Sequence, residues 1–486
     1  MNKFIEVTNQ FIDGEWKEGT SKKKGTILNP FNNEVIAEVA LASKEDVNSA
    51  FLIANKAQKE WEKTSAEEKI AVLHRAAKFM EDHSEEIVDI MVQESGSTVG
   101  KAQFELYATL QAFKEAATYP KRMEPVVSPS NETPGKVNHV IRKPIGVVSS
   151  ISPFNFSLFL SIRTIVPAIA AGNAVVHKPD LQTAMSGGTV IAKAFEEAGL
   201  PAGIFNLIIA DIAEIGDAMV DNPAANFVSF TGSTAVGRHI GAVAGRNLKR
   251  VALELGGNSP FLVLEDADVD QAVNAAVFGK FLHCGQICMI VNRILVHRSV
   301  HDEFVKKFVA KASGLSYGNP ADPTVVIGPL INERQIEKVL NFAKMAEDEG
   351  ATVALRGKRD GNVVTPFVFT DVKNNGGISQ CEIFGPIATI ISFETEEEGI
   401  RLANETEYGL SAGIFTKDLA RGVAVAQQIE SGMAHVNDQS VHVEAEMPFG
   451  GEKGSGLGRF GGQWSLEEFT TVQWVTVQEG NKVYPF

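Results

Sequence analysis

The spacing of apolar residues predicts helices through residues 43–119. Four apolar side chains recur at intervals of three or four positions, as on one face of a helix: Ile70, Leu73, Ala77 and Met80. Just before them, the segment TSAEE at 64–68 places Thr and Ser three residues ahead of two glutamates, a pattern typical of a capping box. We interpret this stretch as scaffold.

From residue 146 to 255 the pattern changes to short apolar runs separated by helical stretches. Runs of strand length occur at 146–151, 174–177, 205–209, 226–230 and 250–254. Helical stretches lie at 158–171, 184–198 and 234–244. This alternation is typical of a parallel sheet covered on both faces. Such sheets bind ligands at the carboxyl ends of their strands.

A second α/β pattern spans residues 256–447, and two segments fit neither unit. One is 122–142, rich in Pro, Ser and Val, and the other is 468–478, where TTVQWVTVQ alternates as a half-buried strand does. A strand without a partner leaves an exposed edge, so we interpret both segments as oligomer-forming. Near the start, the dipeptide Asp13-Gly14 favours a tight hairpin turn.

Composition narrows the class of protein. The chain has 486 residues and a net charge of −15, which disfavours binding to nucleic acid or an anionic membrane. Its first residues carry acids and no apolar core of signal-peptide length, which argues against secretion. Three cysteines imply no disulfide framework. We therefore expect a cytoplasmic protein of two or three domains.

Three cysteines are candidate nucleophiles: Cys284, Cys288 and Cys381. A buried, inert thiol is the usual state of a cysteine, so none of them is a nucleophile on its own evidence. Cys284 and Cys288 would share a face if their stretch is helical. His283 beside them suggests a metal site, but no second pair at zinc-like spacing supports it, and we expect no metal.

Two polar residues stand where catalytic groups are useful. Glu254 ends an apolar strand against a Gly-Gly turn, where partial desolvation would raise its pKa toward that of a base. Asn155, in SPFNFS, could donate a fixed hydrogen bond to a developing oxyanion. Taken alone, each residue is better explained by an ordinary structural role, as a strand-end glutamate and as a turn asparagine.

Phosphate-binding signals point to one helix start. The G-x-G-x-x-G match at 456–461 follows no convincing strand and opens no βαβ unit. In FTGSTAVG, Gly232 and Ser233 follow a strand and open the helix that carries Gly237, an arrangement that suits a pyrophosphate. Lys178 closes another strand, where it could reach a ribose or phosphate or be simply solvated.

Taken together, these motifs resemble the aldehyde dehydrogenase superfamily over nearly the whole chain. The matching pieces, in order, are SPFNFS, GNAVVHKP, FTGSTAVG, LELGGNSP, GQIC, EIFGP, YGLSAGIFT and PFGGEKGSGLGRFGG. The resemblance implies a nicotinamide-dependent oxidation of an aldehyde. Cys288 would be the nucleophile, Asn155 and the Cys288 backbone N–H would hold the oxyanion, and Glu254 would activate the hydrolytic water.

The resemblance also assigns cofactor residues. Gly232, Ser233 and Gly237 would lie beneath the pyrophosphate, and Lys178 would bond the adenosine ribose. Three more would surround the nicotinamide end: Glu382 on its ribose, Phe384 near the ring, and Phe154 at a position that is usually tryptophan.

Besides Phe154, three positions depart from the family pattern. Leu181 stands three residues after Lys178, where strict NAD users often carry a glutamate. Without that acid, the repulsion against a 2′-phosphate is gone, so NAD with tolerance of NADP is expected. Ser157 replaces a usual proline and Cys381 a usual glutamate, and neither is expected to touch the chemistry.

Local motifs favour an aromatic aldehyde. SPFNFSLFLSIRT, KPDLQTA, GQICM and HVNDQSVHVEAEMPFGG resemble vanillin, benzaldehyde and salicylaldehyde dehydrogenases, with vanillin the best single guess. Phe156, Ile287 and Val441 could wall a pocket for a ring, or be ordinary core residues. An aliphatic aldehyde or succinate semialdehyde is the alternative, with Arg163 as the nearest arginine for a carboxylate. A cysteine hydrolase is a further alternative, which would turn over without a nicotinamide cofactor. A structural relative is another, which intact Cys288, Glu254 and Asn155 disfavour.

The expected fold is α/β and aldehyde dehydrogenase-like, with three parts. Residues 1–121 and 143–254 would form a Rossmann-type dinucleotide-binding domain, and 255–447 an α/β catalytic domain. Residues 122–142 and 463–486 would form a small β arm for oligomerisation, giving a homodimer or homotetramer.

We expect Leu181→Glu to shift cofactor preference toward NAD, because the added carboxylate can bond the ribose and would repel a 2′-phosphate. The ratio of kcat/KM values for NAD and NADP measures this shift. An unchanged ratio would show that another residue sets the preference.

Overall fold

The computed structural model describes residues 3–486, and eight strands form its first sheet. In sheet order they are β2 (Glu15–Lys17), β1 (Gln10–Ile12), β9 (Phe205–Leu207), β8 (Ala174–Lys178), β7 (Val147–Ile151), β10 (Phe227–Thr231), β11 (Arg250–Glu254) and β23 (Gly456–Leu457). Strands β9, β8, β7, β10 and β11 run parallel. The antiparallel hairpin β1–β2 extends the sheet beyond β9, and the antiparallel strand β23 lies beyond β11. The predicted parallel sheet is therefore confirmed, with strand bounds that differ by one or two residues.

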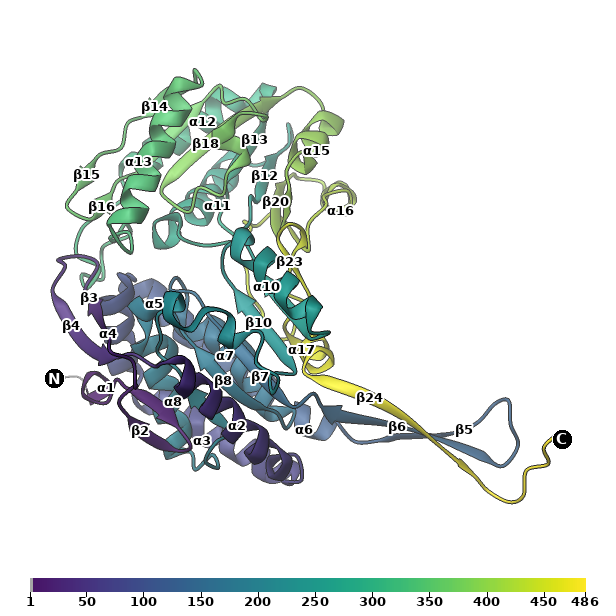
Figure 1. Ribbon diagram of the computed structural model, residues 1–486. Helices are drawn as coiled ribbons and strands as arrows, with labels where there is room; N and C mark the ends of the chain where they lie inside the picture. The colour runs from purple at the N-terminus through teal and green to yellow at the C-terminus, as the bar shows by residue number, and fades with distance from the viewer. Residues whose placement is uncertain (1–2) are drawn as a thin grey trace.

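Helices from residues 44–246 pack against this sheet (Figure 1). They include α2 (Lys44–Trp61), α3 (Ala66–Asp82), α4 (Ser84–Ser95), α5 (Val99–Ala116), α7 (Ser157–Ala170), α8 (Val190–Glu197) and α10 (Thr234–Arg246). Helix α7 is buried along its whole length, because its sequence SLFLSIRTIVPAIA is apolar on every side. Any charge carried by α7 therefore lies in the interior.

Side-chain caps define where these helices begin. Ser43 starts α2 with a complete capping box, in which its hydroxyl accepts from the Asp46 N–H and the Asp46 carboxylate accepts from the Ser43 N–H. Ser65 caps α3 by accepting from the Glu68 N–H, as expected from TSAEE. The Glu68 side chain does not accept from the Ser65 N–H, so the capping box is incomplete. The helical sequence at the start of the chain thus sets its own boundaries.

The predicted helix over 184–198 is only partly α-helical. Residues Leu181–Thr183 form a 3₁₀ turn (η1) and Met185–Thr189 a π-helical turn (η2), so α8 begins only at Val190. The buried carboxylate of Glu94, at the end of α4, accepts from the N–H groups of Met185 at 3.1 Å and Ser186 at 2.5 Å. Glu94 thus provides hydrogen-bond acceptors for the N–H groups of the widened π-helical turn. Because Glu94 is distant in sequence, residues 184–198 alone do not predict this turn.

A second sheet forms the core of residues 256–447. Its order is β14 (Thr352–Leu355), β17 (Phe367–Thr370), β18 (Ile387–Phe393), β13 (Arg293–His297), β12 (Pro260–Val263), β20 (Ser411–Phe415) and β21 (Met433–Val436). All neighbours are parallel except β14. Its helices are α11 (Val269–Phe281), α12 (Arg298–Ser313), α13 (Glu333–Asp348), α15 (Glu396–Asn404) and α16 (Leu419–Ala426). It has a hydrophobic core of its own, and the roles expected for the two units stay predictions.

A narrow three-stranded sheet projects from the body (Figure 1). It consists of β5 (Val126–Pro129), β6 (Lys136–Pro144) and β24 (Thr470–Gln478), all antiparallel. The two segments that fitted neither unit therefore pair with each other, over nine residue pairs from Pro144–Thr470 to Lys136–Gln478. We refer to this sheet as the arm.

The remaining elements are short. They are β3 (Lys24–Leu28), β4 (Val35–Ala40), α1 (Lys3–Glu6), α6 (Tyr119–Arg122), α9 (Ile212–Ile215), η3 (Gly216–Met219), η4 (Leu282–Gly285), α14 (Gly377–Gln380), α17 (Gly462–Glu468), β15 (Arg359–Asp360), β16 (Val363–Val364), β19 (Tyr408–Gly409) and β22 (Glu452–Lys453). The hairpin predicted at Asp13-Gly14 joins β1 to β2, and both residues have positive φ, as a primed turn requires. Among residues 3–486, no helix combines the length and the apolar character needed to cross a membrane.

Candidate active site

A cavity of about 180 Å³ lies where the two α/β units meet. The carboxyl ends of β7, β10 and β11 contribute one side, and the Cys288 loop, α13 and the segment before β18 contribute the other. Its lining residues are Pro153, Phe154, Asn155, Leu160, Thr231, Gly232, Ser233, Glu254, Leu255, Cys288, Lys338, Glu382 and Phe384. Residues far apart in sequence thus come together, including all three that the sequence proposes for catalysis.

Cys288 is half-buried in the loop that follows η4. Burial and the Glu382 carboxylate raise the pKa of its thiol to about 12, and Glu254 adds to this while Arg163 opposes it. The sulfur is therefore protonated near neutral pH and needs a proton acceptor before it can act as a nucleophile. Gly257 permits the close approach of this loop, since a Cβ there would lie 2.2 Å from the Cys288 carbonyl oxygen.

Glu254, the last residue of β11, is buried, and neither carboxylate oxygen has a hydrogen-bond partner. Burial raises its pKa to about 7, while the guanidinium groups of Arg163 and Arg459 act in the opposite direction. The nearest cationic atom is Nη2 of Arg163, 3.9 Å from Oε2. A carboxylate with free lone pairs and a pKa near neutrality can accept a proton from a thiol or a water.

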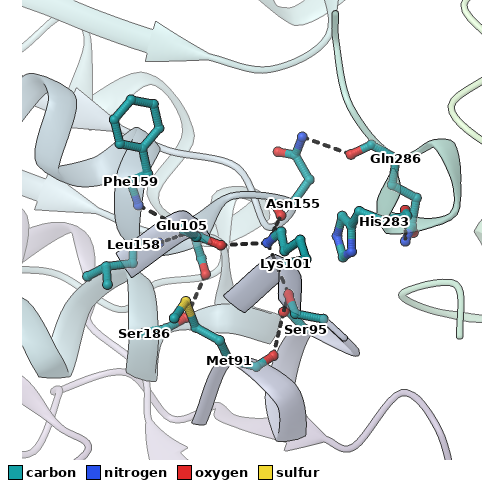
Figure 2. A network of polar contacts seen from close by, with 12 residues as sticks. Met91, Ser95, Lys101, Glu105, Asn155, Leu158, Phe159, Ser186, His283 and Gln286 are labelled. Carbon is teal, nitrogen blue, oxygen red and sulfur yellow. Dashed lines mark hydrogen bonds and ion pairs between the residues drawn. The ribbon is translucent and has the colours of Figure 1, made fainter. Parts of the chain in front are cut away.

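Asn155 lies between the end of β7 and the start of α7 and is buried. Its side-chain Nδ2 donates a hydrogen bond of 2.9 Å to the carbonyl of Gln286, two residues before Cys288 (Figure 2). One N–H of the amide is thereby fixed to the cysteine loop. An oxyanion role for the remaining N–H stays a prediction.

The helical face expected for Cys284 and Cys288 is absent from this part of the chain. His283 and Cys284 have positive φ values of 48° and 56°, so the chain turns sharply inside η4. The Cys284 sulfur donates to the Gly328 carbonyl at 3.1 Å. Within residues 3–486 there is no group of three His, Cys, Asp or Glu residues arranged to hold a metal ion.

Comparison with known proteins identifies the family. The aldehyde dehydrogenase family model matches residues 16–475 of this chain. The chain belongs to the aldehyde dehydrogenase family. A vanillin dehydrogenase of Corynebacterium glutamicum is 47% identical, with 98% of each chain covered. Benzaldehyde dehydrogenase YfmT of Bacillus subtilis is 46% identical, with 100% of each chain covered.

A solved structure agrees with the sequence matches. The crystal structure of an NAD-dependent benzaldehyde dehydrogenase from Corynebacterium glutamicum has a TM-score of 0.90 and 44% identity, covering 99% of this chain and 98% of that chain. The family membership and the α/β fold expected from the sequence motifs are both confirmed.

In this aldehyde dehydrogenase, the start of α10 meets the cavity that Cys288 and Glu254 line. Ser233 caps the helix by accepting from the Val236 N–H, and Gly232 donates to the Glu254 carbonyl at 2.9 Å. A Cβ at Gly237 would lie 2.2 Å from the Leu255 side chain, so this glycine lets α10 pack closely on the strand end. Gly232 and Ser233 line the cavity, whereas Gly237 lies one turn into the helix.

The other predicted cofactor residues are divided between the cavity and its surroundings. Glu382 accepts from the Gly257 N–H at 3.1 Å, and burial raises its pKa to about 7 while Lys338 lowers it. The rings of Phe384 and Phe154 meet edge to face in the cavity wall, with centroids 6.0 Å apart. Lys178 ends β8 beside β7 and is buried, and it donates to the Pro179 carbonyl at 3.2 Å.

Phe156, Ile287 and Val441, named from the sequence as walls for a ring, are all buried in the core around the first sheet. The cavity beside Cys288 is walled by other side chains, among them Leu160 and Phe384. The alternative reading of these three as core residues therefore fits the structure.

A buried ion pair behind Asn155 was missed by the sequence interpretation (Figure 2). Lys101 Nζ, on α5, donates to the Glu105 carboxylate at 2.5 Å, to the Asn155 carbonyl at 2.6 Å and to the Ser97 hydroxyl at 3.0 Å. Both charged side chains are fully buried. The ammonium group has three donors, and all are used.

Glu105 completes this network by capping α7. Its Oε1 accepts from the backbone N–H groups of Leu158 at 2.8 Å and Phe159 at 3.1 Å. The ion pair thus holds both the Asn155 backbone and the helix that follows it. A Lys and a Glu four residues apart are common on solvated helix faces, so only the surrounding structure distinguishes this pair.

We expect Lys101→Met to lower the free energy of unfolding by about 3 kcal/mol or more, because Glu105 keeps a buried charge without a partner. It should also slow thioester formation, since the Asn155 carbonyl loses its donor. Urea unfolding measures the first effect, and the rate of the NADH burst measures the second.

The matched control is Lys101→Met/Glu105→Gln, which removes the unpaired charge and keeps an acceptor for α7. We expect the double variant to recover part of the stability while the burst stays slow. A parental burst rate in Lys101→Met would show that the ion pair does not position Asn155.

Proposed function

We propose that this aldehyde dehydrogenase oxidises an aromatic aldehyde to the carboxylic acid with NAD, and tolerates NADP. Relatives named vanillin dehydrogenase and benzaldehyde dehydrogenase match it along nearly the full length at 42–47% identity. The observation that carries the proposal is the single cavity shared by Cys288, Glu254 and Asn155 with Gly232, Ser233 and Glu382. The free thiols of all three cysteines support a reducing, cytoplasmic setting.

The residues around the cavity suit a dinucleotide. Backbone N–H groups at the start of α10 are aligned with the positive end of a 13-residue helix, which favours phosphate. The Glu382 carboxylate and the Lys178 ammonium offer partners for ribose hydroxyls. When bound, the nicotinamide cofactor supplies an acceptor for hydride. Leu181, near Lys178, presents no carboxylate that would repel a 2′-phosphate.

The first half of the reaction forms a bond between Cys288 and the substrate. The thiol proton passes to Glu254, the sulfur attacks the aldehyde carbon, and the carbonyl oxygen becomes an alkoxide held by the Asn155 amide and the Cys288 N–H. The carbon–hydrogen bond then breaks, its hydrogen leaves with two electrons, and the carbonyl re-forms as a thioester. The released proton leaves Glu254 for solvent.

The second half returns the enzyme to its starting state. Glu254 takes a proton from a water molecule, whose oxygen bonds to the thioester carbon. The carbon–sulfur bond breaks, the carboxylic acid is released, and the sulfur is reprotonated. The same carboxylate serves both halves, which requires a pKa close to the working pH, as its burial provides.

Succinate semialdehyde carries a carboxylate, which an arginine in the site would have to bind. Arg163 is the arginine nearest to Glu254 among the described residues, and its guanidinium is already engaged. The Arg163 guanidinium faces Glu254 and stacks over the rings of Phe449 and Phe460, at 4.2 and 4.9 Å from the ring centroids. The apolar side chains beside Cys288 include Phe154, Leu160 and Phe384, which favour an aromatic ring.

We expect Glu254→Gln to give one NADH burst that forms more slowly than in the parent, because Cys288 has lost its proton acceptor. The steady state should then be slower by about a hundredfold or more, because the thioester lacks a base for hydrolysis. Vanillin, benzaldehyde, succinate semialdehyde and acetaldehyde are compared by absorbance with NAD and with NADP. The highest kcat/KM should belong to an aromatic substrate.

The control is Cys288→Ala, which should bind NAD, as seen from a raised Tm, yet lose oxidation by about a thousandfold or more. Turnover of this variant within tenfold of the parent, or a Glu254→Gln enzyme without a burst and with a normal steady state, would contradict the mechanism. Preference for acetaldehyde or succinate semialdehyde would contradict the substrate class.

We further propose that the arm joins subunits into a homodimer or a homotetramer. Val126, Val140 and Trp474 lie side by side across its three strands, with exposed fractions of 64, 39 and 69%. An apolar row of this kind on a thin sheet gains stability when a second surface covers it.

We expect Trp474→Glu to lower the molar mass measured by light scattering to that of a monomer, since a carboxylate in this row opposes burial. The control is Gln473→Glu, which places the same charge on the opposite face of β24. An unchanged mass in Trp474→Glu would remove the arm from the interface.

A further inference from the structure

The interior of α7 carries a charge that the reaction steps above do not use. Arg163 is 6% exposed, and its Nε and Nη1 atoms have no hydrogen-bond partner. Its Nη2 lies 3.9 Å from Oε2 of Glu254, a carboxylate that also lacks any hydrogen-bond partner. Two buried, opposite charges therefore face each other without a hydrogen bond between them.

Aromatic rings hold the guanidinium in place. The Arg163 Cζ atom lies 4.2 Å from the centroid of the Phe449 ring and 4.9 Å from that of Phe460. Aromatic faces attract cations. Burial lowers the pKa of Arg163 and the Glu254 carboxylate opposes this, and a guanidinium, with its usual pKa above about 12, remains charged near neutral pH. The two phenylalanine rings hold the guanidinium in position but carry no hydrogen-bond acceptor that would neutralise it. The positive charge of Arg163 therefore acts on the nearby Glu254 carboxylate.

The distance has a chemical consequence. A bidentate salt bridge would occupy the lone pairs of the carboxylate and make it a poor base. At 3.9 Å the cation stabilises the charged carboxylate while leaving both oxygens free to accept a proton. We propose that Arg163 is a positioning residue that keeps the Glu254 base ionised and unblocked in the catalytic cavity. The proposal rests on the role of Glu254 in the proposed function.

The other charged groups near Glu254 do not replace this one. Arg459 also lowers the pKa of Glu254, but its Nη1 donates to the carbonyls of Gly451 and Gly458 at 2.9 Å and its Nη2 pairs with Glu452. Cys288 faces the carboxylate as a neutral thiol near neutral pH. Since burial raises the pKa of Glu254 to about 7, removing the cation raises it further and leaves the base protonated near neutral pH.

The test compares Arg163→Gln with the parent enzyme, using benzaldehyde and NAD across a range of pH. We expect the acidic limb of the kcat profile to move toward higher pH by about one unit or more, because a nearby cation lowers a carboxyl pKa by that much. In alkaline solution, where Glu254 ionises without help, kcat should return to within about threefold of the parent. Arg163→Lys keeps the charge and should move the limb back toward its parental position.

A control variant, Arg356→Gln, removes an exposed guanidinium that pairs with Glu347 and should leave the limb in place. An acidic limb that is unmoved in Arg163→Gln overturns the proposal, as does a kcat that stays low at every pH in a variant with a parental Tm. A change confined to KM also overturns it, since that places Arg163 on the substrate. If the parent enzyme oxidises no aromatic aldehyde, the proposed function fails instead.

Discussion

The register of the parallel strands is the constraint on which the site depends. Within the first sheet, Ile151 lies beside Lys178 and Phe230, and Thr231 lies beside Glu254. Since parallel strands end at the same edge, the loops after β7, β10 and β11 are brought together without contact in sequence. Loops next to the second sheet place Cys288 and Glu382 on the opposite wall of the same cavity. A shift of one residue between β10 and β11 would turn the Glu254 side chain to the other face of the sheet.

Burial gives these side chains their chemical character. Loss of solvent raises the pKa of the Cys288 thiol and of the Glu254 and Glu382 carboxyls, so all three favour their neutral forms. A few fixed cations oppose this tendency where a charge is needed. The Lys101–Glu105 pair differs, since its ions are matched by hydrogen bonds and serve as structure. The cavity that Cys288 lines thus has the ionisable groups of Arg163 and Glu254 beside it without hydrogen bonds, whereas the Lys101–Glu105 pair behind Asn155 is fully hydrogen-bonded.

Most of the fold and the proposed catalytic residues could be predicted from sequence, because strand ends and glycine turns leave local patterns. What could not be predicted depends on groups distant in sequence. The π-helical turn at 185–189 needs the Glu94 carboxylate, and the sharp turn at His283 breaks the helical face expected for the cysteines. Lys101 and Glu105 are four residues apart, a spacing shared by many pairs on solvated helix faces. The pairing of Arg163 with Glu254 depends on the burial of α7, so the sequence does not indicate it.

The arm has a consequence for how the molecule is made. Strand β24 follows β6 at a long distance in sequence, yet it pairs with it, and the Arg142–Thr470 hydrogen bond joins residues 328 positions apart. Contacts of such separation carry a large loop-closure cost and form late. During synthesis, one edge of β6 therefore has no partner until β24 has been made. Closure of this sheet therefore follows the synthesis of β24, and a chain that lacks β24 would leave the backbone groups along one edge of β6 unpaired.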